Sequence, residues 1–190
     1  MRVLFDEQIF LFQKRGGISR YFTELIRTFL KEPGLDVEPV ITFNKSSNEI
    51  LLSLSKEFDL GITRISSPKT FQILQSIKAN SLSFPKVDVL HHTFYSKTFW
   101  HSGYRGPRTC THYDMIPETF HQTRFGINPH LSKHWYFDNV NHIFSISESA
   151  RKDLLQIWPE IVTPISTTHL GKPEVPKQEF HRIQGYIIFI

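Results

Sequence analysis

Cysteine is almost absent from this 190-residue sequence, in which Cys110 is the only one. A single thiol excludes an internal disulfide framework and is typical of a reducing cytosol. No run of about 18 apolar residues occurs, so no membrane-spanning helix is expected. The first residues read directly as a strand and do not resemble a signal peptide. We therefore expect a cytoplasmic protein, with peripheral contact to the inner face of the cell membrane left open.

Long blocks of one charge are also missing. The chain has 22 Lys and Arg against 18 Asp and Glu, a net charge of +4 and a pI of about 9.2. This excess favours an anionic partner, such as a phosphorylated substrate or an anionic membrane surface. The cations are scattered, however, and no nucleic-acid motif is visible, so we expect no nucleic-acid partner.

Motifs for common cofactors are absent as well. Neither the G-x-G-x-x-G fingerprint nor the G-x-x-x-x-G-K-[ST] phosphate loop occurs, which disfavours an ordinary nucleotide-binding oxidoreductase. The sequence has no H-E-x-x-H and no paired Cys/His zinc spacing, so we expect no metal ion. Cys110 lies inside a strand pattern and is expected in the core, not as a nucleophile.

The residues that are present describe a globular chain, 39% hydrophobic with 17 phenylalanines. Strands are expected at residues 2–5, 36–43, 87–91, 108–112, 142–146 and 165–169. Helices are expected at 18–30, 69–82, 128–140 and, behind a Ser147 cap, through Trp158, with a short helix and then an extended piece at 50–65. Loops or turns are expected at 6–15, 44–48, 92–105 and 113–120. This alternation predicts an α/β fold with a Rossmann-like, open, mostly parallel sheet and helices on both faces.

The first 30 residues combine a strand, a glycine turn and a helix. Apolar residues recur at helical spacing from Ile18 to Leu30, and Gly16 and Gly17 come directly before them. In this arrangement free backbone N–H groups and the positive end of a helix dipole meet, which suits a phosphate. The simpler alternative is a Gly-Gly turn that only starts a core helix.

Polar residues follow two of the expected strands at their carboxyl ends, where open parallel sheets bind ligands. His91 and His92, with Tyr95 nearby, predict a rim that binds sugar or phosphate, or else a pair of partly buried polar groups. His112 ends the next strand, two residues before Asp114. Such a histidine can hydrogen-bond a substrate hydroxyl or stabilise developing charge. The alternative is a satisfied histidine at a strand end.

Four short segments occur in an order and spacing that carry a family resemblance: residues 16–21 (GGISRY), 91–96 (HHTFYS), 111–118 (THYDMIPE) and 143–154 (IFSISESARKDL). Together they resemble the N-terminal half of the family 4 retaining glycosyltransferases, which have the two-domain GT-B fold. The resemblance implies a metal-independent enzyme that moves a sugar from a nucleotide diphosphate donor to a glycan or lipid-linked acceptor. Bacterial polysaccharide or lipopolysaccharide synthesis is the implied setting. The nucleotide sugar would be a co-substrate, and no cofactor is expected.

The resemblance also implies roles for individual residues. It places His112 beside the donor sugar as the catalytic residue, in a domain that holds most of the acceptor site. The implied contacts are Gly16, Gly17 and Arg20 to the donor diphosphate, and His91, His92, Tyr95 and Asp114 to the acceptor. A small aliphatic residue is usual in this family where Tyr113 stands, so Tyr113 is expected to reshape the pocket near His112.

The same resemblance divides the chain. Residues 1–169 would be the acceptor-side domain, 170–185 a linker, and 186–190 the first strand of a C-terminal domain that binds the nucleotide sugar. The family's paired glutamates and its Lys/Arg diphosphate clamp have no counterparts in these 190 residues, so we expect the chain alone to be inactive. The alternative is a non-catalytic single-domain module that binds a glycan or an anionic lipid.

Overall fold

A computed structural model describes residues 1–65, 84–119 and 132–171, and the observations below concern these residues. The helix expected at 69–82, the strand expected at 186–190 and nearly all of the expected linker at 170–185 lie outside the described residues. The proposed division of the chain into domains therefore stays a prediction.

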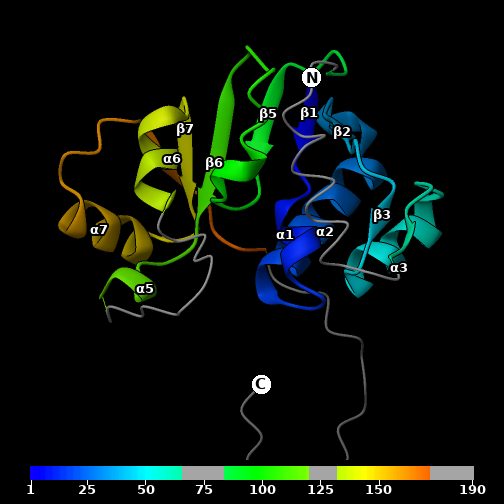
Figure 1. The fold of residues 1–190 in the computed structure, drawn as a ribbon, viewed down its shortest axis with the longest axis horizontal. Helices are drawn as coiled ribbons and strands as arrows, with labels where there is room; N and C mark the ends of the chain where they lie inside the picture. Colours follow the sequence, from blue (N-terminus) through cyan, green and yellow to red (C-terminus); the bar gives the residue numbers. More distant parts are fainter. Residues whose placement is uncertain (66–83, 120–131, 172–190) are drawn as a thin grey trace, which may run out of the picture.

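A six-stranded sheet forms the centre of the protein. Its strands are β1 (Arg2–Phe5), β2 (Glu38–Val40), β5 (Val89–His92), β6 (Arg108–His112), β7 (His142–Ser145) and β8 (Ile165–Thr167). The strand order is β2-β1-β5-β6-β7-β8, and every adjacent pair is parallel. The α/β prediction of a Rossmann-like, open, mostly parallel sheet is confirmed. The carboxyl ends of the strands face the lower edge of Figure 1, where the short helices α1 (Gln8–Phe12) and α5 (Ile116–Thr119) lie.

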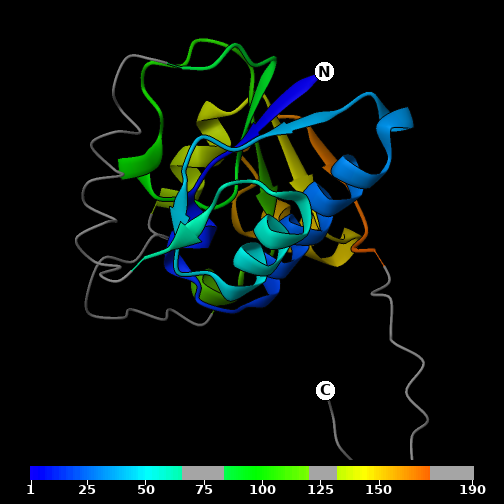
Figure 2. The same cartoon turned by 90° about the vertical axis from the view of Figure 1, so that its right-hand side faces the viewer.

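Four longer helices surround this sheet: α2 (Gly17–Lys31), α3 (Glu49–Phe58), α6 (Lys133–Asn139) and α7 (Glu148–Ile157). Helix α3 packs on α2 and lies in front of it in Figure 2. Short strands β3 (Lys45–Ser46) and β4 (Thr63–Arg64) form a separate parallel pair, and single 3₁₀ turns occur at Pro33–Leu35 and Lys97–Phe99. Within the described ranges, none of the helices is both long and apolar enough to cross a membrane.

Helices cover both faces of the sheet, as predicted. Successive residues of a strand point to opposite faces, and two adjacent histidines show what each face carries. The His91 ring packs on Phe22 of α2, with 5.5 Å between ring centroids. The His92 ring packs on Tyr136 of α6, with 5.0 Å between ring centroids.

Two helix predictions are confirmed closely. Helix α2 covers the expected range and follows Gly16, its N-cap, whose backbone is fully extended. Its inner face buries Phe22 and Ile26 completely. Helix α7 begins behind Ser147, whose Oγ accepts the N–H of Ala150 at 3.0 Å, so the predicted cap is confirmed.

The loop predictions are wrong in three places. The expected loop at 6–15 contains α1, because Ile9 and Phe10 turn fully into the core. The expected loop at 113–120 contains α5, in front of which the Asp114 carboxylate accepts the N–H of Ile116. The expected turn at 44–48 contains β3.

Several element boundaries also differ from the predictions. The segment 50–65 divides into α3 and β4, close to its expected helix and extended piece. The strand expected at 36–43 pairs only over β2. Pro39 is tolerated in β2 because this strand is at the edge of the sheet. Helix α6 begins at Lys133, and residues 128–131 of the expected helix lie outside the described part of the chain.

Replacing Phe22 by alanine should lower the free energy of unfolding by about 3–5 kcal/mol, because the ring is fully buried between α2 and the sheet. Urea denaturation measures this loss. Thr28→Ala on the exposed side of the same helix is the matched control and should change stability by less than about 0.5 kcal/mol. Equal losses for the two variants would contradict this packing.

Candidate functional site

The switch point of the sheet lies between β1 and β5, because the chain leaves β1 toward β2 and then crosses to the other side. Open α/β sheets usually bind ligands in the crevice at this point. Here the chain itself fills the crevice around the buried carboxylate of Asp6. This carboxylate accepts hydrogen bonds from Thr93 (N at 3.0 Å, Oγ1 at 2.5 Å), from Gln8 Nε2 at 2.6 Å and from His92 Nδ1 at 2.8 Å.

The charges in this network are complementary. Burial by itself would raise the pKa of Asp6, but the interactions with His92, followed by those with His101 and Thr93, together outweigh burial, so the pKa is lowered. Burial lowers the pKa of His92. A neutral His92 that donates from Nδ1 to Asp6 keeps a lone pair on Nε2, and Arg108 Nη1 lies 3.3 Å away to donate to it. Within the described residues the network is satisfied, and Asp6, Gln8, His92 and Thr93 are all fully buried.

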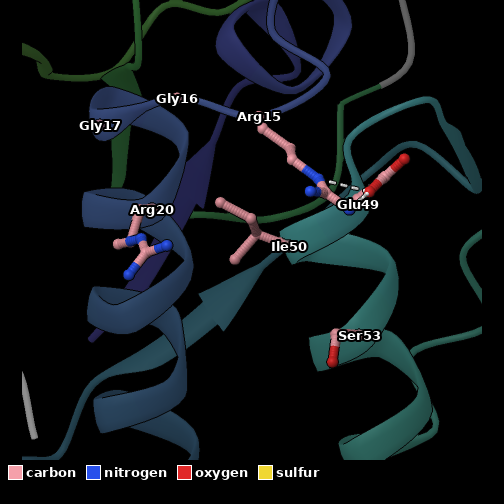
Figure 3. Close-up of a pocket in the computed structure, with 7 residues that line it drawn as sticks. All are labelled: Arg15, Gly16, Gly17, Arg20, Glu49, Ile50 and Ser53. Atoms are coloured by element: carbon pink, nitrogen blue, oxygen red, sulfur yellow. Dashed lines mark hydrogen bonds and ion pairs between the residues drawn. The ribbon is translucent and has the colours of Figure 1, made fainter. Parts of the chain in front are cut away.

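A larger hollow lies beside the switch point, between the first turns of α2 and α3 (Figure 3). It is open and has a volume of about 680 Å³. The residues that line it are Arg15, Gly16, Gly17, Arg20, Glu49, Ile50 and Ser53. The three residues predicted to contact a diphosphate therefore lie at one place.

The first turn of α2, which borders this hollow through Gly16, Gly17 and Arg20, retains N–H groups without a partner among the described residues. Gln13 Oε1 accepts the N–H of Ser19 at 3.2 Å, which satisfies one N–H of the turn. The N–H groups of Gly17 and Ile18 have no hydrogen-bond partner among the described residues. A side chain at Gly16 would collide with Gln13, since an added Cβ would lie 2.3 Å from its Oε1, whereas Gly17 has open space around it.

Arginine side chains provide the positive charge of the hollow. Arg15 reaches across it to the Glu49 carboxylate, which also pairs with Lys14 at 3.3 Å. Arg20 is exposed one turn into α2. Helix dipole, free N–H groups and guanidinium together suit an anion.

His112 ends β6 with its side chain fully buried. Its Nδ1 lies 3.2 Å from the Ser145 hydroxyl, and that hydroxyl donates its own proton to the Ser147 carbonyl at 3.2 Å. Burial, followed by the charge of Lys133, lowers the pKa of His112 to about 4. We assign the proton of the neutral ring to Nδ1, because the Ser145 hydroxyl donates to the Ser147 carbonyl; the lone pair is then on Nε2, which has no hydrogen-bond partner among the described residues.

A second, very small hollow of about 20 Å³ lies next to the turn that follows His112. It is lined by Ile18, Phe94, Tyr95, Tyr113, Asp114 and Lys133. Tyr95 and Asp114, both predicted to contact an acceptor, thus lie together, and Ile18 connects this place to the first turn of α2. Tyr113 is buried here and donates its hydroxyl to the Thr93 carbonyl at 3.0 Å.

The other two predicted acceptor residues, His91 and His92, line neither hollow. His91 is enclosed under α2, and its two ring nitrogens lie 2.8 Å from Thr109 Oγ1 and 3.0 Å from Thr111 Oγ1. His92 belongs to the Asp6 network. Their role toward an acceptor stays a prediction, and their contacts within the described residues are structural.

Sequence reasoning missed Asp6 and Lys133. Asp6 directly follows a buried strand, which is a signal that could have identified it. Lys133 carries no such signal, because a lysine in a helix is usually solvated. Cys110 is buried as predicted, and burial raises the pKa of its thiol.

Among residues 1–65, 84–119 and 132–171, no three His, Cys, Asp or Glu side chains gather in a way that could hold a metal ion. The one H-x-x-x-H spacing in the sequence joins His130, which lies outside these ranges, to His134. His134 lies 2.9 Å from Asp138 and 2.7 Å from Glu160.

Comparison with family models, with curated proteins and with solved structures found no match for this chain.

The buried neutral histidines should make the fold sensitive to acid. The pKa of His91 is lowered to about 3 by burial and that of His112 to about 4, whereas unfolded histidine titrates near 6.5. Below about pH 6.5 the unfolded state binds more protons, so stability should fall by about 1–3 kcal/mol between pH 6.5 and 5.5. His101 opposes this in part: burial lowers its pKa, but the hydrogen bond and charge of Glu7, together with the charge of Asp6, outweigh burial and raise it.

Urea denaturation at pH 7.5, 6.5 and 5.5 measures this dependence. His91→Asn should give a shallower pH profile than the wild type, whereas His169→Asn at an exposed position should retain the wild-type profile. Parallel profiles for His91→Asn and the wild type would show that His91 does not contribute.

Proposed function

We propose that this chain is the acceptor-side domain of a retaining glycosyltransferase. The enzyme would move a sugar from a nucleotide diphosphate donor to a glycan or lipid-linked acceptor, in bacterial polysaccharide or lipopolysaccharide synthesis. The observation that carries the proposal is the hollow at the start of α2. Gly16, Gly17 and Arg20 line it, and the space next to Gly17 is open.

In this mechanism the leaving diphosphate would be stabilised at that hollow. The free N–H of Gly17 and the Arg20 guanidinium would bind its oxygens, and the α2 dipole would favour the charge that develops there. No metal ion is needed for this electrostatic role. The Arg15–Glu49 ion pair would hold the opposite wall of the hollow in place.

His112 would act on the donor sugar. Its buried, neutral ring presents an unpartnered Nε2 lone pair, which can accept a hydrogen bond from a sugar hydroxyl. Tyr95 and Asp114 at the adjoining small hollow would contact the acceptor, and transfer would retain the anomeric configuration. The basic surface of the domain would allow peripheral contact with an anionic membrane face in the cytoplasm.

Diphosphate recognition can be tested on the chain itself. Titration with pyrophosphate, followed by NMR, should shift the amide signals of Gly17, Ile18 and Arg20 first. Arg20→Ala should weaken this binding by about tenfold, the loss of one charge-assisted contact. Arg105→Ala, at an exposed arginine outside both hollows, is the matched control and should leave the affinity unchanged at constant salt.

Equal weakening by both variants would reduce the interaction to general surface charge and contradict the diphosphate site. Binding of a glycan or of anionic lipid vesicles, with no response to pyrophosphate, would instead support the non-catalytic module.

We expect the purified 190-residue chain to turn over no nucleotide sugar at a measurable rate. The reason is that the resemblance assigns the nucleotide to residues of a second domain, which have no counterparts here. Release of nucleoside diphosphate from UDP- and GDP-sugars, with and without glycan acceptors, measures this. Any acceptor-dependent turnover that His112→Ala abolishes would contradict the expectation.

A further inference from the structure

Lys133 is a lysine with a buried charge. Its side chain is 1% exposed, and Nζ donates to the Asp114 carbonyl at 2.8 Å and to Glu118 Oε2 at 2.9 Å. The ammonium also lies 5.6 Å from the centroid of the Tyr95 ring. A lysine is rarely buried unless it is paired in this way, and exchanging its charge for a neutral side chain would leave Glu118 without its partner.

The position of Lys133 connects α6 to the turn that carries Asp114. Residues four apart share one face of a helix, so Lys133 and Phe137 point to the same side of α6. The Phe137 ring packs edge-on against His112, with 5.5 Å between ring centroids. One face of α6 therefore contacts both the turn after β6 and the histidine at the end of that strand.

Among the described residues, few charged groups act on the pKa of His112. Lys133 comes from α6 and Asp114 from its own turn, while β7 contributes the uncharged Ser145. Burial is the largest influence on the pKa of His112, and the Lys133 ammonium lowers it further, with Asp114 opposing. The Ser145 hydroxyl fixes the proton on Nδ1, as described above.

We propose that Lys133 is a positioning residue for His112: its ammonium holds the Asp114–Glu118 turn on α6, whose Phe137 packs on the imidazole, and so sets the position and the surroundings of this buried ring. For its meaning in catalysis this inference rests on the proposed function. The pKa and the tautomer of His112 do not depend on the proposed function, because they can be measured without any substrate.

NMR of the imidazole nitrogens between pH 8 and pH 5 tests the proposal, with the His112 signals identified by their loss in His112→Gln. In the wild type we expect a neutral His112 with its proton on Nδ1 throughout this range. In Lys133→Met the His112 pKa should rise by about one unit, so that imidazolium appears near pH 5. Lys133→Arg keeps the charge and should keep the wild-type behaviour.

The double variant Lys133→Met/Glu118→Gln removes both charges of the pair and keeps the test valid if the single variant unfolds. This double variant should show the same rise in the His112 pKa. Circular dichroism at each pH checks that it is folded. A His112 that stays neutral to pH 5 in a folded variant without the ammonium would overturn the proposal. If the rise occurs but pyrophosphate does not bind to the chain, the role of Lys133 stands and the proposed function fails.

Discussion

The buried carboxylate of Asp6 is the constraint on which the rest of the site depends. It lies at the end of β1 and accepts hydrogen bonds from the end of β5 and from α1, so three separate segments are fixed around one charge. Removing such a charge from water is costly unless every acceptor position is satisfied. Here Thr93, Gln8 and His92 supply the donors. As a result the crevice at the switch point is closed by the protein itself.

With that crevice filled, the larger hollow of the protein lies at the first turn of α2. The chain between β1 and α2 is occupied by α1, and Gln13 at its end satisfies the N–H of Ser19 in α2. The N–H of Gly17, which has no hydrogen-bond partner among the described residues, belongs to the lining of the hollow, whose far wall belongs to α3. Ile18 then borders the small hollow near Asp114. The hollow proposed for the diphosphate and the small hollow proposed for the acceptor are thus adjacent, with one turn of α2 between them.

Local patterns were sufficient for much of this architecture. The 3.6-residue period predicted α2, the Ser147 cap predicted α7, and short apolar runs predicted the central strands. The alternation of these elements predicted the parallel sheet, whose carboxyl edge brings Gly16, Gly17 and Arg20 together. Local patterns did not predict the helix within residues 6–15. Helix α1 is only five residues long and is held by contacts with the core and with the Asp6 network. The burial of Lys133 likewise depends on Glu118, fifteen positions away, which no local period reveals.

The three histidines at strand ends show how structural and functional roles can be distinguished. Both ring nitrogens of His91 meet threonine hydroxyls, and both of His92 meet charged partners, so each ring is complete within the fold. His112 is equally buried, yet only its Nδ1 is engaged by Ser145 among the described residues. Leaving a buried polar atom without a partner costs about 1–3 kcal/mol, which a ligand hydroxyl on Nε2 would offset. The same residue type at neighbouring strand ends therefore differs in its hydrogen bonding, and the unsatisfied nitrogen distinguishes His112 as the candidate for the ligand contact proposed above.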